Sequence, residues 1–341
     1  MSRPRTLVRS AAASVAALAL TLVGLPTAHA AIGGHVALGD SYSSGLGTGS
    51  YYADGTDCRR SPQAYGVLLA ERAGLELTLA ACSGATTASV ATEQLSALTG
   101  DTARVTITVG GNDVGFAPVL TECAKPGWWG DCDGAIDEAL QIATQQLPGR
   151  LGSLFDQIRS RSPQAVVVVS GYPQLFNGED CHALTFFSGS EMGRLNSAAT
   201  QLNSVIRQQA VAAGFRYVDA VPTFEGHAVC DDAEWVNNLS VPVDESFHPN
   251  VAGHRGYAEV FGSGFPTGTT ARHDTTTTPT LPYAVGRSER VTPPDLRSDQ
   301  ARAAAREAGI SQQELTAMAR AQERGASNAR LEAMSRQAVS G

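Results

Sequence analysis

The stretch HVALGDS, residues 35–41, decides the fold, because an apolar run in it leads directly into a small polar turn. Similar runs occupy residues 75–81, 105–109, 166–169 and 215–218. They are apolar throughout rather than alternating, which is typical of strands buried on both faces of a parallel sheet. Helical patterns lie between them, at residues 63–73, 136–160 and 192–213. This alternation predicts an α/β fold, a three-layer α/β/α sandwich around a doubly wound parallel sheet.

Charge is distributed unevenly along the 341 residues, whose net charge is −8. Residues 31–265 carry 12 Lys and Arg against 25 Asp and Glu, so the body of the chain is strongly acidic. A surface of this sign repels phosphate backbones and anionic membranes. We therefore expect no nucleic-acid partner and no electrostatic docking on lipid head groups.

Residues 1–30 have the pattern of a secretory signal peptide. Three arginines fall among the first nine residues, residues 11–25 are apolar, and Ala28-His29-Ala30 has the small-x-small form of a cleavage site. We expect cleavage after Ala30 and export by the Sec route, since no twin-arginine pair precedes the apolar run. An uncleaved anchor is the alternative, but the apolar run is short for a membrane span. After cleavage no integral span is expected, and the mature protein is predicted to be secreted.

The chain contains six cysteines, and an even number in an exported protein favours disulfides. None of them forms a C-x-x-C pair, which makes a structural zinc site improbable. The sequence alone leaves the pairing open. We prefer the sequential pairing because each bond then closes a local loop; it joins Cys58 with Cys82, Cys123 with Cys132, and Cys181 with Cys230.

The composition changes near residue 266. Residues 31–265 are predicted to form the main domain, and residues 266–298, rich in Thr and Pro, to form a linker. Residues 299–341 are rich in Ala and Arg, and Ser311 with Glu314 has the form of a capping box. We expect a partly helical tail, either a mobile appendage, which we prefer, or an element for surface adhesion.

Small polar clusters follow three of the predicted strands. They are Gly39-Asp40-Ser41, Cys82-Ser83-Gly84 and Gly110-Gly111-Asn112-Asp113. Ligands of parallel sheets bind beyond the carboxyl ends of the strands, so these clusters are expected to meet. A serine at a strand-to-helix turn exposes its hydroxyl beside backbone amides that can hold an oxyanion. Taken singly, each cluster could instead be a helix cap or an ordinary turn.

A fourth cluster, DESFHPN at residues 244–250, places His248 between acidic residues and a proline. With Ser41, Gly84 and Asn112 it completes four blocks, in order, that resemble those of the GDSL or SGNH hydrolase superfamily. The resemblance covers residues 32–262 and is closest to secreted actinobacterial lipases, esterases and phospholipases A1. It implies a flavodoxin-like α/β/α fold and hydrolysis of carboxylic esters, without metal or other cofactor.

The resemblance also implies the roles of the site residues. Ser41 is the expected nucleophile and His248 the general base, and the Ser41 and Gly84 amides with the Asn112 side chain are the expected oxyanion hole. The chain departs from the family pattern three residues before the histidine, where Glu245 replaces the usual Asp. Either Glu245 or the main-chain carbonyl of Ser246 could orient the imidazole, since both can accept a hydrogen bond from Nδ1. We favour the carbonyl.

The substrate is not determined by these four blocks, because one set of catalytic residues serves many esters. An aromatic-lined cleft formed by loops 45–60, 116–132 and 171–191 would suit acyl chains, although these aromatics could equally pack against their own loops. The aromatic residues in the loops are Tyr51, Tyr52, Phe116, Trp128, Trp129, Phe186 and Phe187. We expect a monomeric lipase or phospholipase A1-like enzyme. The alternatives are an acetyl esterase on plant polysaccharide and a non-enzymatic surface-binding module.

Overall fold

The computed structural model describes residues 33–182, 184–266, 278–283 and 290–340. The expected signal peptide, residues 1–30, lies outside these described residues, as do residues 267–277 and 284–289 of the expected linker. Within the described part of the chain, none of the helices combines the length and the apolar character that crossing a membrane requires.

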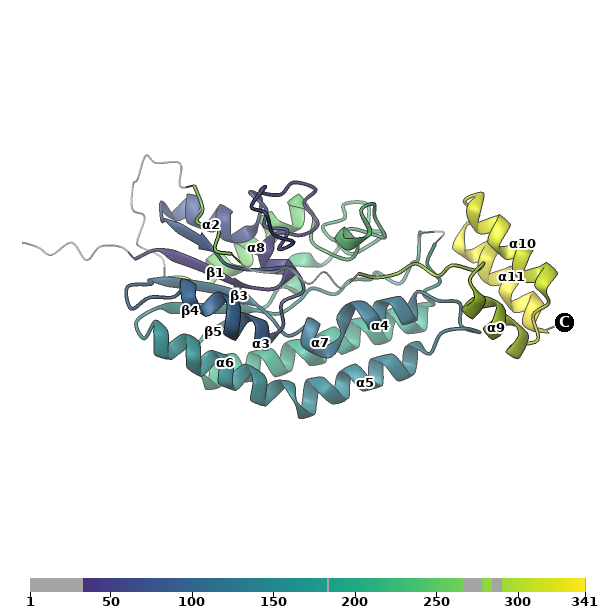
Figure 1. Ribbon diagram of the computed structural model, residues 1–341, viewed down its shortest axis with the longest axis horizontal. Coiled ribbons are helices and arrows are strands. Elements are labelled where there is room, and N and C mark those ends of the chain that lie inside the picture. Colours follow the sequence, from purple (N-terminus) through teal and green to yellow (C-terminus); the bar gives the residue numbers. More distant parts are fainter. Residues whose placement is uncertain (1–32, 183, 267–277, 284–289, 341) are drawn as a thin grey trace, which may run out of the picture. The chain divides into compact units, whose positions relative to one another are not determined.

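Five parallel strands form one sheet with the order β2-β1-β3-β4-β5 (Figure 1). This is the flavodoxin-like order, in which the direction of winding reverses between β1 and β3. Residues that follow these two central strands therefore meet at the carboxyl edge of the sheet. The strands are β1 (His35–Gly39), β2 (Leu77–Leu79), β3 (Arg104–Thr108), β4 (Val166–Ser170) and β5 (Arg216–Val218).

Helices cover both faces of this sheet, which confirms the predicted three-layer α/β/α sandwich. Helices α2 and α8 lie on one face, and α3 to α7 lie on the other (Figure 1). The buried core lies between these layers and contains strand residues such as Leu38, Ile107 and Val168. The helices of this part of the chain are α1 (Ser41–Ser44), α2 (Tyr65–Ala73), α3 (Thr87–Ser89), α4 (Phe116–Cys123), α5 (Cys132–Gln145), α6 (Leu147–Arg161), α7 (Gly189–Ala212) and α8 (Val251–Ser263).

The single helix predicted for residues 136–160 is wrong, since α5 ends at Gln145 and α6 begins at Leu147. Pro148 explains the break, because proline has no N–H to bond the preceding turn and is tolerated only at the start of a helix. Helix α4 was also missed by the sequence patterns. Both differences matter for function, because α4 and α5 line the pocket described below.

Three disulfides join Cys58 to Cys82, Cys123 to Cys132, and Cys181 to Cys230, which is the sequential pairing. The first bond attaches the loop that follows α1 to the turn containing Gly84. The second joins the end of α4 to the start of α5. Loops at the carboxyl edge of the sheet are thus held covalently, which restricts the unfolded chain and stabilises the fold.

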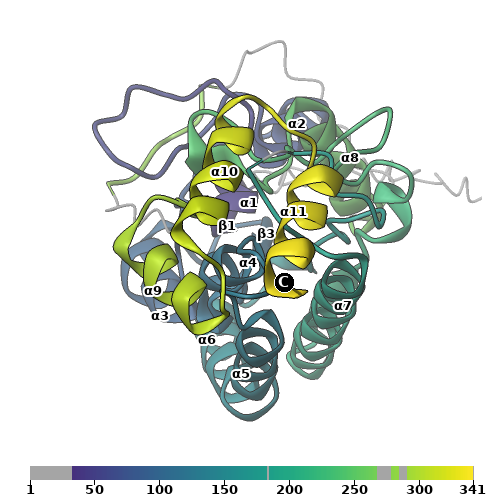
Figure 2. The ribbon, with the colours of Figure 1, turned by 90° about the vertical axis from the view of Figure 1, so that its right-hand side faces the viewer.

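Three further helices follow near the C-terminus (Figure 2): α9 (Asp299–Glu307), α10 (Gln312–Glu323) and α11 (Asn328–Ser340). They share an apolar cluster that includes Leu315, Met318 and Leu331. Phe186 belongs to this cluster, and Trp128 and Trp129 pack against it. These three aromatic side chains, anticipated as possible walls of a substrate cleft, therefore contact the C-terminal helices instead.

The buried histidine of β1 predicts a specific pH dependence of stability. Burial, and secondarily the charge of Arg104, lowers the pKa of His35 from 6.5 to about 3. The unfolded chain therefore binds a proton that the folded chain excludes, and the free energy of unfolding falls as the pH drops from about 6.5 toward 3. His35 Nε2 lies 2.9 Å from the Thr106 hydroxyl. His35→Gln keeps a side chain that can form this hydrogen bond but removes the titratable group, so this contribution should disappear.

We expect the unfolding free energy of the parent chain to fall by about 2 kcal/mol more between pH 7 and pH 5 than that of His35→Gln. Urea denaturation at the two pH values measures both differences. An equal pH dependence in the two proteins would show that the pKa of His35 is the same in the folded and the unfolded chain, contrary to this prediction.

Candidate active site

A tight turn at the end of β1 presents Ser41 as the first residue of α1. Gly39 has φ of 120°, and a Cβ there would lie only 2.2 Å from the carbonyl oxygen of Thr108, so this position requires glycine. Asp40 caps α1 by accepting a hydrogen bond from the Tyr42 N–H at 3.0 Å. The turn therefore places the serine hydroxyl at the carboxyl edge of the sheet, beside the amino end of a short helix.

Gln94 holds this turn from the side, a contact that sequence patterns did not reveal. Its Oε1 accepts the Gly39 N–H at 2.8 Å, and its Nε2 donates to the Gly39 carbonyl at 2.9 Å. The side chain is almost completely buried. A glutamine within a polar helical stretch gives no signal of such a role, because most glutamines in that setting face solvent.

His248 lies against the serine, although 207 positions separate them in the sequence. Its Nε2 is 2.8 Å from the Ser41 Oγ, and its Nδ1 is 2.9 Å from the carbonyl oxygen of Ser246. A carbonyl only accepts hydrogen bonds, so Nδ1 carries the proton and Nε2 is the acceptor that faces the hydroxyl. The orientation is the one that proton removal from serine requires.

Burial lowers the pKa of His248 to about 4, while the bond to the Ser246 carbonyl and the charge of Asp244 act in the opposite direction. The imidazole is therefore neutral at neutral pH and can accept a proton. Ser41 and His248 are only 6% and 8% exposed, so the pair lies at the bottom of a depression rather than on the open surface.

The backbone before the histidine is in an uncommon conformation. Phe247 has φ of 60°, which is unfavourable for a bulky side chain and persists only where the surroundings compensate for it. Its N–H donates to the Asn237 carbonyl at 2.9 Å, and its own carbonyl accepts the Tyr42 hydroxyl at 2.7 Å. This turn directs the Ser246 carbonyl toward the imidazole.

The two acidic residues before the histidine have other partners. Glu245 accepts the Tyr51 hydroxyl at 2.6 Å, and Asp244 forms an ion pair with Arg59 at 3.0 Å. Both bonds attach loop 45–60 to loop 243–248. The acceptor that the structure places on Nδ1 is the Ser246 carbonyl, and the Glu245 carboxylate is bonded elsewhere.

Asn112 begins a short turn after β3 and lies beside the segment that contains Gly84. One N–H of its side-chain amide donates to the Ala85 carbonyl at 3.0 Å. Asp113 reinforces the contact by accepting the Thr87 N–H at 2.9 Å and the Thr87 hydroxyl at 2.6 Å. Ser41 and Asn112 line the same pocket. The fold thus brings together all four blocks that are separated in the sequence.

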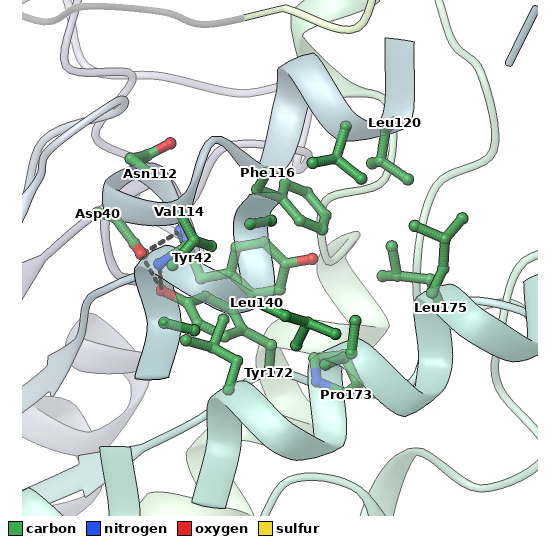
Figure 3. A pocket seen from close by; sticks show the side chains of 18 of the residues that line it. Asp40, Tyr42, Asn112, Val114, Phe116, Leu120, Leu140, Tyr172, Pro173 and Leu175 are labelled. Atoms are coloured by element: carbon green, nitrogen blue, oxygen red, sulfur yellow. Dashed lines mark hydrogen bonds between the residues drawn. The ribbon is translucent and has the colours of Figure 1, made fainter. Parts of the chain in front are cut away.

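An apolar pocket of about 70 Å³ opens from this site between α4, α5 and α7 (Figure 3). Asp40, Ser41 and Asn112 stand at one end of it, and aliphatic side chains and Tyr172 form its walls. Of the aromatic residues singled out in the sequence, Phe116 is the one that lines this pocket. The other wall residues are Tyr42, Gly111, Val114, Val119, Leu120, Ala139, Leu140, Ala143, Pro173, Leu175, Leu195, Ala198, Ala199 and Leu202.

Comparisons with known proteins agree with this arrangement. Residues 37–255 match the profile of the GDSL-like Lipase/Acylhydrolase family. A lipase of Streptomyces rimosus is 40% identical over 232 residues, which are 67% of this chain and 85% of that protein. The match to the family ends within α8, ahead of α9, α10 and α11.

Two crystal structures resemble the chain closely. The extracellular lipase from Streptomyces rimosus has a TM-score of 0.65 at 38% identity, and the match covers 68% of this chain and 100% of that one. Phospholipase A1 from Streptomyces albidoflavus NA297 has a TM-score of 0.65 at 39% identity, and the match covers 69% of this chain and 100% of that one.

Proposed function

The chain belongs to the GDSL-like lipase/acylhydrolase family and is a carboxylic ester hydrolase, and we propose that it cleaves lipid esters through an acyl-enzyme on Ser41. One observation carries the proposal: the 2.8 Å contact between Ser41 Oγ and His248 Nε2 at the end of an apolar pocket. A neutral serine is a weak nucleophile, and an adjacent base is what activates it.

The first half of the reaction forms the acyl-enzyme. His248 Nε2 takes the hydroxyl proton as Ser41 Oγ bonds to the ester carbonyl carbon, and the carbonyl oxygen becomes an oxyanion. The Ser41 and Gly84 amides and the Asn112 side chain are the proposed donors to this oxyanion. By analogy with measured oxyanion holes, each donor is worth about 3 kcal/mol in the transition state. The protonated imidazole then gives its proton to the leaving alcohol as the ester bond breaks.

Water completes the cycle. His248 removes a proton from a water molecule that attacks the acyl carbonyl, and the same proton returns to Ser41 Oγ as the fatty acid leaves. Throughout, the Ser246 carbonyl keeps the Nδ1 proton in place at 2.9 Å. We therefore propose a Ser41–His248 dyad oriented by a main-chain carbonyl. The engagement of Glu245 with Tyr51 supports this choice over a triad.

The shape and chemistry of the pocket support an acyl chain as the group it binds. Its walls are almost entirely hydrocarbon, which suits an alkyl chain better than a sugar ring, whose hydroxyl groups would be buried without hydrogen-bond partners. An acetyl group would leave most of these walls without a contact. The similar proteins are named lipase and phospholipase A1. Lipid esters are therefore favoured over the acetyl groups of a polysaccharide.

We further propose that the enzyme is a secreted monomer whose catalytic domain comprises residues 31–265. The signal-peptide pattern of residues 1–30 and the three disulfides support export, because disulfides persist in oxidising compartments. A similar lipase is described as extracellular. Residues 266–298 and 299–341 would then be a linker and a C-terminal tail appended to this domain.

Ser41→Ala tests the nucleophile directly. We expect ester hydrolysis to fall by about a millionfold, because the acyl-enzyme can no longer form, while the fold stays intact. The assay compares short- and long-chain p-nitrophenyl esters, a phosphatidylcholine and an acetylated xylan, with circular dichroism as the control for folding. Residual activity near the parent level in a folded variant would contradict the assignment, and parent activity confined to the xylan would contradict a lipid substrate.

Glu245→Gln separates the dyad from a triad. The glutamine side-chain oxygen can still accept the Tyr51 hydroxyl, so we expect kcat within about threefold of the parent value. Loss of a true triad carboxylate lowers kcat by about ten-thousandfold. Steady-state kinetics on a single ester distinguishes the two cases, and a large loss in the folded variant would make Glu245 the partner of His248.

Ala139→Leu tests the pocket as the acyl site. The added methylenes fill space that the distal part of a long chain would occupy, and each excluded methylene costs about 0.8 kcal/mol. We expect kcat/KM for a dodecanoyl ester to fall about tenfold, with the butanoyl ester within about twofold of the parent. Gln141→Leu, on the exposed side of α5, is the matched control. Equal losses for both chain lengths would argue against this pocket as the acyl site.

A further inference from the structure

We propose that Tyr172 is a positioning residue for ester hydrolysis: its hydroxyl joins the Gly111 amide to the Asp40 carboxylate and so fixes the Asn112 turn against the Ser41 turn. The inference rests on the proposed function. Tyr172 follows β4, which is neither of the strands that carry the nucleophile and the oxyanion turn, and the four sequence blocks do not include it.

The hydroxyl makes two hydrogen bonds in opposite directions. It accepts the Gly111 N–H at 2.9 Å and donates to Asp40 Oδ2 at 2.5 Å (Figure 3). Gly111 directly precedes Asn112, and Asp40 directly precedes Ser41. The phenolic oxygen therefore connects Gly111, next to the Asn112 donor, with Asp40, next to the Ser41 amide.

Asp40 is a firm anchor for this bridge. Its other oxygen accepts the Thr108 hydroxyl at 2.8 Å and the Tyr42 N–H at 3.0 Å. Burial raises the pKa of Asp40 to about 6, and the bonds from Tyr172, Thr108 and neighbouring amides oppose this rise. At neutral pH the carboxylate is ionised, and hydrogen bonds to an ionised acceptor are about twice as strong as those between neutral groups.

Tyr172 is itself held in place from a fourth element. Asn203 of α7 accepts the Tyr172 N–H at 2.8 Å and donates to the Tyr172 carbonyl at 2.7 Å. A Cβ on Gly111 would lie 3.2 Å from the Tyr172 hydroxyl, so the backbone of the turn comes close to the ring. The bridge therefore joins two rigidly supported groups, and neither can relax easily when it is removed.

The position of the bridge explains why it matters for rate. Strand pairing fixes β1 and β3 only as far as their last paired residues, Gly39 and Thr108. Asn112 lies four residues beyond Thr108, where backbone pairing no longer controls its distance from the Ser41 amide. A displacement of about 1 Å between catalytic groups can cost about a hundredfold in rate. The Tyr172 hydroxyl restrains the Asn112 turn relative to the Ser41 turn, because it bonds the residue before each of them.

Tyr172→Phe keeps the ring on the pocket wall and removes both hydrogen bonds. We expect kcat to fall about ten- to a hundredfold, short of the loss of a whole oxyanion donor, with KM within about threefold. Ser162→Ala is the matched control, because the Ser162 side chain is also buried and its hydroxyl donates to the Thr99 carbonyl at 2.8 Å, at the amino edge of the sheet and away from both turns. That variant should show a similar loss of thermal stability and a kcat within about threefold of the parent.

The inhibition constant of a trifluoromethyl ketone measures how well the site binds an oxyanion. A purely structural role of Tyr172 would not change this constant selectively. The ketone adds to Ser41 and forms a tetrahedral oxyanion, so its inhibition constant should weaken in Tyr172→Phe by the same factor as kcat/KM. The fatty acid product, which forms no oxyanion adduct, should inhibit both proteins equally. Parallel weakening of both ligands would overturn the proposal, as would an unchanged kcat in Tyr172→Phe or an equal fall in Ser162→Ala.

Asp40→Asn tests the bridge from its other end. It takes the place of Tyr172→Phe as the test if that variant does not fold. The amide keeps one acceptor oxygen and replaces the other with a donor, so it cannot accept on both sides as the carboxylate does. We therefore expect kcat to fall in this variant too, and the double variant should be no slower than the slower single variant. Additive losses would overturn the proposal. Failure of the proposed function is a separate result, since the parent enzyme would then hydrolyse no ester or Ser41→Ala would remain active.

Discussion

The carboxylate of Asp40 is almost completely buried one residue before Ser41, the proposed nucleophile, and the arrangement of the site follows from how that charge is satisfied. A buried charge is tolerated only where several hydrogen bonds replace its hydration. Here the donors come from the carboxyl ends of three different strands and include Thr108, the last residue of β3, and Tyr172, which follows β4. The carboxylate can therefore be both buried and ionised only when β1, β3 and β4 are paired in their native order. The same condition brings Ser41 and Asn112 together, so folding of the sheet and assembly of the site are one event.

Because the winding reverses between β1 and β3, the site is bordered by the His248 loop on one side and by the apolar pocket on the other. Loops from the α2 and α8 side deliver His248, which lies just before α8, while α4, α5 and α7 on the other side deliver the apolar pocket (Figure 1). Ser41 stands at the boundary between them. An ester carbonyl placed on it would have the base on one side and hydrocarbon walls on the other. This separation keeps the polar leaving group and the acyl chain in distinct environments without any further domain.

The sequence predicted those parts of the structure that depend on local chemistry. Unbroken apolar runs predicted the strands, and the clusters at residues 39–41, 82–84 and 110–113 indicated the carboxyl edge where the site lies. It did not predict the pocket, because the wall residues Leu140 and Leu202 look like ordinary core positions of amphipathic helices until the helices are packed. Gln94 and Tyr172 gave no signal either, because the groups they bond are distant from them in the sequence. Pro148 was the only sequence signal of the break between α5 and α6 at Gln146. A proline is compatible with the start of a new helix as well as with a kink within one helix.

The choice between Glu245 and the Ser246 carbonyl could not be made from residue types, because the left-handed conformation of Phe247 decides it. That conformation turns the carbonyl toward His248 and leaves the carboxylate to Tyr51. The consequence is electrostatic. A carboxylate on Nδ1 would raise the pKa of the histidine strongly, whereas the neutral carbonyl and the more distant Asp244 only partly offset the effect of burial. In the proposed dyad the imidazole is thus kept neutral over a wide pH range, and the imidazolium formed during turnover would depend on the oxyanion beside it for its stabilisation. Accurate placement of the oxyanion donors therefore matters more in this site than in one where a carboxylate shares that task.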